Sequence, residues 1–157
     1  MTDQFTNPAL RRIGLLALFR NAEGHPLLLR QRDRQFQPWS LPGGCAVGGE
    51  PPTHALRRKV REETGLEARP GLVLALQYTQ ASLESAEGYN LVVDCGELPD
   101  NTHFCLNGAE FSAHGFIPAN RLADHAQPHT AARTRSALRA LKAGGGIELL
   151  EVIPLLG

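Results

Sequence analysis

The 157-residue sequence lacks the features that mark several common protein classes. Sixteen basic and sixteen acidic residues give a formal net charge of +0, so no overall positive field is available to hold a nucleic acid. The three cysteines, Cys45, Cys95 and Cys105, are widely spaced and form no CxxC pair, which argues against a zinc site and favours reduced thiols. A Cys95–Cys105 disulfide across a hairpin is the less favoured alternative. We therefore expect a cytoplasmic chain without a nucleic-acid partner.

Long apolar segments are also missing. Residues 1–8 contain no basic region followed by an apolar stretch, so they do not resemble a signal peptide. The apolar runs Ile13–Phe19 and Leu27–Leu29 are far too short to cross a bilayer, and we expect no membrane partner. What is present, 42% hydrophobic and 20% charged residues, is ordinary for a globular domain with a core of its own.

Apolar patterns and turn residues predict a single domain over residues 1–157, of the α/β or α+β class, with strands on both sides of a central helix. Residues 1–10 are expected to form a loose arm, and residues 147–156 an apolar tail. Strands are predicted at Ile13–Phe19, Pro26–Gln31, Gly71–Thr79 and Asn90–Cys95, and short ones at Thr102–Leu106 and Phe116–Ile117. Helices are predicted at Thr53–Thr64, Ala119–His125 and Thr130–Lys142, the last with a solvated face over Arg133–Arg139.

A glycine-rich loop leads into the central helix. Trp39–Gly44 contains a proline and paired glycines, which demand a tight and irregular backbone. Thr53 is the predicted N-cap of the helix, and Gly65 its stop. On that helix Leu56 and Val60 lie one turn apart and are predicted to face the core.

A second face of the same helix carries charge. Lys59, Glu62 and Glu63 are three and four residues apart, so they share that face, and Glu50 lies upstream in the loop. Divalent cations such as Mg²⁺ prefer oxygen ligands, usually one or two carboxylates completed by water and substrate phosphates. The alternative is that Glu62 and Glu63 are solvated charges that pair with Arg58 and Lys59.

The spacing of this segment resembles the Nudix box, G-x5-E-x7-R-E-U-x-E-E-x-G-U, where U is a bulky apolar residue. The matching positions are Gly44, Glu50, Arg58, Val60, Glu62, Glu63, Gly65 and Leu66. One position departs from the pattern, because Lys59 stands where the box has glutamate. The resemblance is sharp over residues 39–66 and looser elsewhere.

The resemblance implies a Nudix fold, in which a mixed β-sheet lies between helices, and a hydrolase of a diphosphate linked to a moiety X. It implies Mg²⁺ or Mn²⁺ as the cofactor and a nucleotide or other diphosphate as the small-molecule ligand, and it also allows a homodimer. Carried over by position, the metal ligands are Glu62, Glu63 and the Gly43 carbonyl, with Glu110 as a further ligand or base. The remaining box positions Gly44, Glu50, Arg58 and Gly65 are structural.

Lys59 changes the charge at the centre of this site by two units. At about 4 Å, two unit charges interact by roughly 4 kcal/mol at an effective dielectric near 20, enough to weaken cation binding. We expect the Lys59 ammonium to pair with Glu63. Three hypotheses follow: slower hydrolysis on Glu62 and Glu63, a base supplied from outside the box by Glu110, His103 or His114, or a module that binds its ligand without hydrolysing it.

Other candidates are weaker. Arg30 and Arg32 end the second predicted strand and are candidates for substrate binding, although exposed strand-end arginines are common. Trp39 either stacks on a base or belongs to the core, and the core is favoured. The segments that would select X are residues 80–89 and 99–113, which contain no decisive motif.

Overall fold

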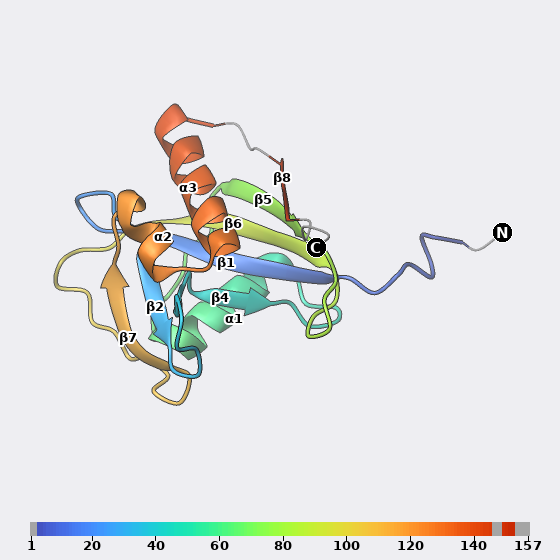
Figure 1. The fold of residues 1–157 in the computed structure, drawn as a ribbon, viewed down its shortest axis with the longest axis horizontal. Helices are drawn as coiled ribbons and strands as arrows, with labels where there is room; N and C mark the ends of the chain where they lie inside the picture. The colour runs from blue at the N-terminus through green and yellow to red at the C-terminus, as the bar shows by residue number, and fades with distance from the viewer. Residues whose placement is uncertain (1–2, 146–148, 153–157) are drawn as a thin grey trace.

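The computed structural model describes residues 3–145 and 149–152, which form two β-sheets and flanking helices (Figure 1). The strands are β1 (Arg12–Arg20), β2 (Leu27–Gln31), β3 (Trp39–Ser40), β4 (Gly43–Cys45), β5 (Val73–Thr79), β6 (Gly88–Glu97), β7 (Phe111–Phe116) and β8 (Leu149–Val152). The helices are α1 (Pro52–Thr64), the 3₁₀ turn η1 (Ala119–Arg121), α2 (Leu122–His125) and α3 (Pro128–Ala143).

The larger sheet has five strands in the order β4-β1-β6-β5-β8. β1 runs parallel to β6 and β5 parallel to β8, whereas the β1–β4 and β5–β6 pairs are antiparallel. The sheet is therefore mixed, as the sequence predicted. A smaller antiparallel sheet has the order β3-β2-β7. The strands β1 and β2, which follow one another in the chain, thus lie in different sheets and are joined by an isolated bridge between Arg20 and Pro26.

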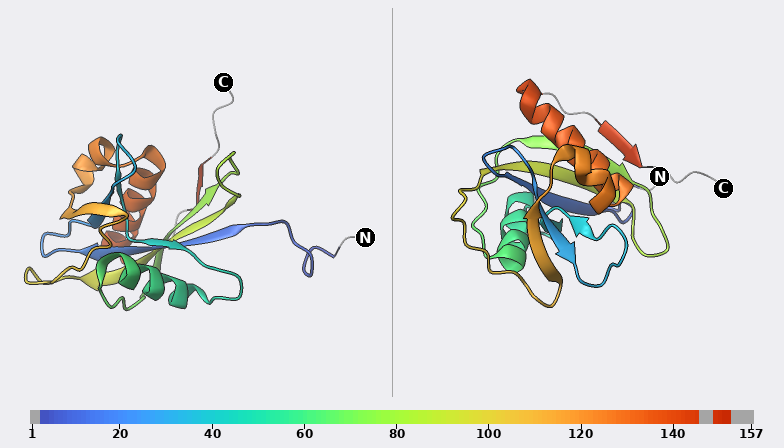
Figure 2. Two further views of the ribbon diagram at one scale, coloured as in Figure 1. Left: turned by 90° about the horizontal axis from the view of Figure 1, so that it is seen from below. Right: turned by 60° about the vertical axis from the view of Figure 1, so that its left-hand side comes forward.

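The helices α1 and α3 cover opposite faces of the five-stranded sheet (Figure 2). Alternating side chains of β1 divide the core between them. Leu15, Ala17 and Phe19 pack with α1, where Leu56 and Val60 are buried as predicted. Leu18 packs on the other face with Ala137 of α3. This sandwich of helix, mixed sheet and helix confirms the predicted α/β architecture.

The start of α1 differs from the prediction, whereas its end agrees with it. The N-cap is Pro51 and not Thr53, and Pro52 occupies the first helical position. Proline is favoured there because its missing N–H is one that the first turn cannot satisfy within the helix. Gly65 ends the helix in a left-handed conformation with φ 73°. A β-carbon at Gly65 would approach the Cβ of Cys105 to 2.9 Å.

Three further predictions are corrected. Thr102–Leu106 forms no strand, because its backbone bonds to the end of α1: the Cys105 N–H donates to the Thr64 carbonyl at 2.9 Å. Of the predicted strand Phe116–Ile117, only Phe116 lies in a strand, as the last residue of β7, which pairs with β2. The face of α3 expected to be solvated is not so throughout, since Arg133 is only 9% exposed. Of the predicted tail, residues 149–152 form β8, and the rest lies outside the described residues.

Candidate functional site

Two glycines in β4 bring this strand close to its neighbours. Gly43 has φ 140° and lies against the Leu15 carbonyl, where any β-carbon would clash. At Gly44 a β-carbon would lie 2.6 Å from Cε of Lys59, so the lysine stem occupies the space that a side chain would fill. Gly44 therefore forms part of the surface on which Lys59 rests.

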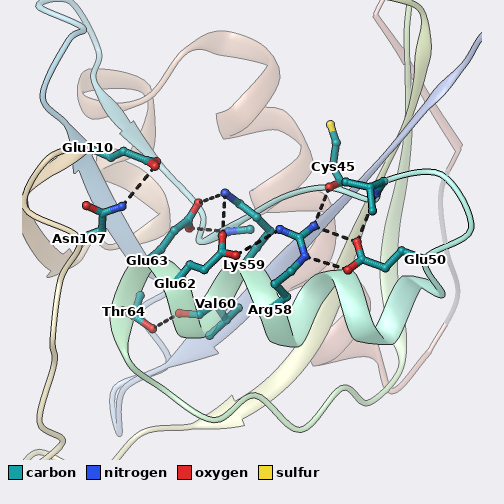
Figure 3. A network of polar contacts seen from close by, with 12 residues as sticks. Cys45, Glu50, Arg58, Lys59, Val60, Glu62, Glu63, Thr64, Asn107 and Glu110 are labelled. Carbon is teal, nitrogen blue, oxygen red and sulfur yellow. Dashed lines mark hydrogen bonds and ion pairs between the residues drawn. The ribbon is translucent and has the colours of Figure 1, made fainter.

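Glu50 and Arg58 join the loop to α1 (Figure 3). Arg58 donates from Nε and Nη2 to the two carboxylate oxygens of Glu50, both at 2.8 Å, and from Nη2 to the Cys45 carbonyl at 3.3 Å. Glu50 also accepts the N–H of Val47 at 3.2 Å. The hydrogen bonds that Arg58 donates lower the pKa of Glu50 to about 2, and the same hydrogen bonds raise the pKa of Arg58. This closed network determines where the loop lies on the helix.

Glu63 lies one and a half turns further along α1 and is buried, at 4% exposure. It accepts a hydrogen bond from the Gly43 N–H at 2.9 Å. Burial raises its pKa to about 7; the Gly43 N–H and the charge of Lys59 oppose that shift, and the nearby charge of Glu110 adds to it. The site therefore holds a carboxyl group whose negative charge is incompletely compensated.

Lys59 lies between two carboxylates of α1. Its Nζ is 3.5 Å from Oε2 of Glu62 and 3.7 Å from Oε1 of Glu63. Both distances fall within the range of ion pairs but are long for hydrogen bonds to a carboxylate. The expected contact between Lys59 and Glu63 is thus present, and the ammonium group is loosely held.

Glu110 comes to this group from the turn before β7 (Figure 3). Its charge contributes to the raised pKa of Glu63, and its Oε1 accepts a hydrogen bond from the Asn107 side chain at 3.3 Å. Asn107 also donates its backbone N–H to the Glu63 carbonyl at 3.0 Å. Nothing in the sequence marked Asn107, because an asparagine in a turn has many other uses. It links the end of α1 to the segment that carries Glu110.

The carboxylates do not by themselves converge on a point. Within residues 3–145 and 149–152, no group of three or more His, Cys, Asp or Glu side chains is arranged to hold a metal ion. Glu62 and Glu63, both at ion-pair distance from the ammonium of Lys59, are the candidate pair for a cation, and Glu62 also pairs with Arg58 at 3.4 Å. Two carboxylates are a sufficient protein contribution when substrate phosphates complete the coordination.

Arg32 and Glu110 share the wall of a hollow of about 650 Å³, between the end of β2 and the start of β7. Arg32 donates to the Gly108 carbonyl at 2.8 Å, which keeps its guanidinium at the rim. Arg30 instead lies beside β7 and donates to the Ser112 hydroxyl at 3.1 Å. Of the two arginines predicted from sequence, only Arg32 lines the hollow.

The other candidates lie in varied settings. Trp39 is half-buried against the core on the α3 side and contacts His125 edge-on, with ring centroids 6.4 Å apart. His114 stacks on Phe104 at 4.0 Å between centroids, and His103 is exposed. The three cysteines are free thiols, so the disulfide alternative for Cys95 and Cys105 is wrong.

Similarity to known proteins identifies the family and the fold of this chain. The NUDIX domain family matches residues 10–141, most of the chain. The chain belongs to the NUDIX domain family. The solved structures that resemble it include a MutT protein from Methanosarcina mazei Go1, with a TM-score of 0.67 and 25% identity over 85% of this chain and 94% of that one. A UDP-X diphosphatase structure gives a TM-score of 0.71 at 22% identity, over 90% of this chain and 68% of that one. These similarities establish the Nudix fold.

Curated relatives match over a shorter stretch. The 8-oxo-dGDP phosphatase NUDT18 of Mus musculus is 33% identical over 69 residues, which are 43% of this chain and 21% of the relative. The Homo sapiens protein of the same name is 34% identical over 64 residues, 40% of this chain and 20% of the relative. The matched stretch thus spans about a fifth of these relatives. Among the described residues of the Nudix chain, no helix is long and apolar enough to cross a membrane.

Proposed function

We propose that this Nudix domain hydrolyses a diphosphate linkage in a nucleoside diphosphate derivative, with Mg²⁺ or Mn²⁺ as cofactor. Family membership supports hydrolysis of a phosphoanhydride. Two relatives of this chain are named as phosphatases of 8-oxo-dGDP, which is a nucleoside diphosphate. The observation that carries the proposal is the buried Glu63, aligned beside Glu62 on a helix that the Glu50–Arg58 network holds in place.

The residues present fit a divalent cation. Glu62 and Glu63 offer hard oxygen donors, and support for their reaching one cationic centre comes from the Lys59 ammonium, which lies 3.5 Å and 3.7 Å from their oxygens. When bound, the metal supplies phosphate charge neutralisation and activation of water. The Gly43 N–H donates a hydrogen bond that orients the Glu63 carboxylate, and burial keeps bulk water away from the carboxylate oxygens. Glu110 is the third carboxylate and the candidate base, with Asn107 positioning it.

In our proposal, Lys59 determines how strongly this site binds its metal. Its ammonium competes with the metal for Glu62 and Glu63, so it reduces cation affinity in the absence of substrate. A bound diphosphate shifts the balance, because its oxygens attract both the metal and the ammonium. We therefore expect weak Mn²⁺ binding that strengthens when a nucleoside diphosphate is present. Arg32 at the rim of the hollow is the candidate contact for the substrate beyond the diphosphate.

The experiment is a hydrolysis panel of nucleoside diphosphate derivatives with Mg²⁺, Mn²⁺ or EDTA, in which nucleoside monophosphate is quantified by chromatography. Calorimetric titration of Mn²⁺, with and without a non-hydrolysable nucleoside diphosphate analogue, accompanies it. Metal-dependent product supports the proposal. Null heats in both titrations together with no product would remove the metal site from it.

The second candidate is a Nudix-fold module that binds a nucleotide and does not hydrolyse it. The ion pairs between Lys59 and the two carboxylates favour it, because they satisfy charge without metal. Saturable binding of a nucleoside diphosphate, with no turnover by the wild-type chain or by Lys59→Glu, would establish this candidate.

A further inference from the structure

On the face of the sheet opposite α1, the start of α3 covers an arginine without a counter-charge. Arg133 is 9% exposed, and its guanidinium points back to the first turn of its own helix. Nη2 donates to the Thr130 hydroxyl at 3.0 Å and Nη1 to Oε1 of Gln77 at 2.9 Å. Its Nε is buried and has no hydrogen-bond partner. Both partners of Arg133 are neutral, so the positive charge is buried uncompensated.

The neighbours of Arg133 add positive charge. Arg12 is close enough to lower the pKa of Arg133, although burial is the larger cause, and that pKa falls to about 10. Burial, then Arg133, Arg34 and Arg12 lower the pKa of His129. Arg12 itself donates to neutral acceptors, the Ser85 hydroxyl and the Asn90 amide oxygen, both at 2.9 Å. Within the described residues, no carboxylate lies at ion-pair distance from Arg12 or Arg133.

The helix adds a further positive element. The 16-residue α3 begins at Pro128, with no side-chain cap and no acidic residue in its first turn. The unpaired N–H groups of a helix N-terminus behave as about half a positive charge. Burying an arginine without an anion is costly, because an isolated charge loses its hydration and gains nothing in return. Arg133, Arg12 and the start of α3 therefore form a place where a negative charge is missing.

We propose that this place, which we call the α3 anion site, binds a phosphate-class oxyanion. Its donors are the guanidinium of Arg133 with its unpartnered Nε, the guanidinium of Arg12, and the backbone N–H groups of His129 and Thr130, since Pro128 has no N–H and that of Ala131 donates to the Gln127 carbonyl. The anion is either free phosphate or a phosphoryl group on a ligand. The site is separate in composition from the carboxylates of α1, and it requires no metal.

The test is thermal unfolding in phosphate-free buffer with EDTA, over a series of inorganic phosphate concentrations. EDTA removes metal, so that phosphate held through a cation at Glu62 and Glu63 does not contribute. The melting temperature of the wild-type chain should rise with the logarithm of the phosphate concentration once that concentration exceeds Kd, by linkage between binding and folding. Arg133→Met should show no such rise, and without phosphate it should melt no lower than wild type. Arg139→Met, exposed on the same helix, should retain the rise.

A second variant keeps the test decisive if Arg133→Met does not fold. Gln77→Glu is nearly isosteric and places a carboxylate 2.9 Å from Nη1 of Arg133. It should abolish the phosphate response, because the missing charge is then internal. A rise in Gln77→Glu or Arg133→Met equal to that of wild type, or no rise in wild type, overturns the α3 anion site.

Two further arms separate this site from the proposed hydrolysis and identify the source of the anion. Glu63→Gln should retain the phosphate response, so failure of the hydrolase proposal leaves this result unaffected. If the anion belongs to the substrate, phosphate and Gln77→Glu should each raise KM while kcat stays unchanged. If it is free phosphate, KM should remain at the wild-type value in both.

Discussion

Glu50 and Glu63 each face a cation of α1, but the two pairs are built differently. Arg58 holds both oxygens of Glu50 at 2.8 Å, and the pKa of Glu50 falls to about 2. Lys59 lies 3.7 Å from Glu63, and burial raises the pKa of that carboxyl group to about 7. The first pair is saturated and holds a loop. The second leaves negative charge uncompensated, which is the state that a cation-binding site requires before its cation arrives.

Glu63→Gln removes the charge from the less tightly paired of the two carboxylates. The amide retains the shape and loses the charge, so hydrolysis should fall by about 100-fold or more; loss of even an outer-shell partner of a metal ligand typically costs 10- to 100-fold. The melting temperature at pH 8 should not fall, because a buried charge is removed. Glu67→Gln, which alters an exposed ion pair with Arg61, is the control and should keep full activity. A collapse of stability together with activity would identify Glu63 as structural.

Lys59→Glu changes the charge beside Glu63 by two units. Removing the competing ammonium and adding a carboxylate should tighten Mn²⁺ binding and raise kcat/KM about tenfold, which requires only about 1.4 kcal/mol. Stability without metal should fall modestly, because three carboxylates then share one helix face.

Lys59→Met is the matched control, since it removes the positive charge without adding a negative one, and its activity should be intermediate. The measurement is kcat/KM of wild type, Lys59→Glu and Lys59→Met, determined in parallel at one metal concentration. If turnover drops in both variants, Lys59 takes part in the reaction, as a point charge on a substrate phosphate.

The features that sequence analysis predicted correctly depend on local spacing. The burial of Leu56 and Val60 follows from helical periodicity, and the left-handed end of α1 at Gly65 from the absence of a side chain. The proximity of Lys59 to Glu63 follows from their separation of four residues. Each of these predictions needed only the chain within one or two turns.

The features that were missed depend on distant parts of the chain. Thr102–Leu106 has the composition of a strand, but its Cys105 N–H donates to the Thr64 carbonyl at the open end of α1 and not to a sheet. Arg133 was assigned to a solvated face because arginine on a helix usually lies there. It is buried because Gln77, more than fifty residues earlier in the chain, accepts its hydrogen bond. No pattern within α3 predicts that contact.

Gly44→Ala tests how far the loose pair depends on its glycine. The new methyl group would lie 2.6 Å from Cε of Lys59, so the lysine stem must shift. We expect a loss of about 1 kcal/mol in unfolding free energy, at the low end for overpacking, since a flexible stem yields. Gly48→Ala is the control, because nothing lies within 4 Å of its new methyl group. Urea unfolding of Gly44→Ala, Lys59→Ala and the double variant should show the loss disappearing when the lysine stem is absent.

The pH dependence of stability should separate the two carboxylates by sign. Glu50 has a folded pKa of about 2 against an ordinary value of 4.5, so its contribution is present above pH 4.5 and is lost as the pH falls towards 2. Glu63 has a folded pKa of about 7, so the folded state binds its proton more tightly and stability falls as the pH rises from 4.5 to 7.

Thermal melts of metal-free protein should therefore show Glu50→Gln below wild type at pH 7 and converging with it near pH 2. Glu63→Gln should match wild type at pH 4 and exceed it at pH 8. Both differences should be small. For Glu50→Gln the reason is that Arg58 is 35% exposed, so solvent screens its ion pair with Glu50. If the two variants shift with the same sign at pH 8, Glu50 and Glu63 do not differ in the way that their contacts indicate.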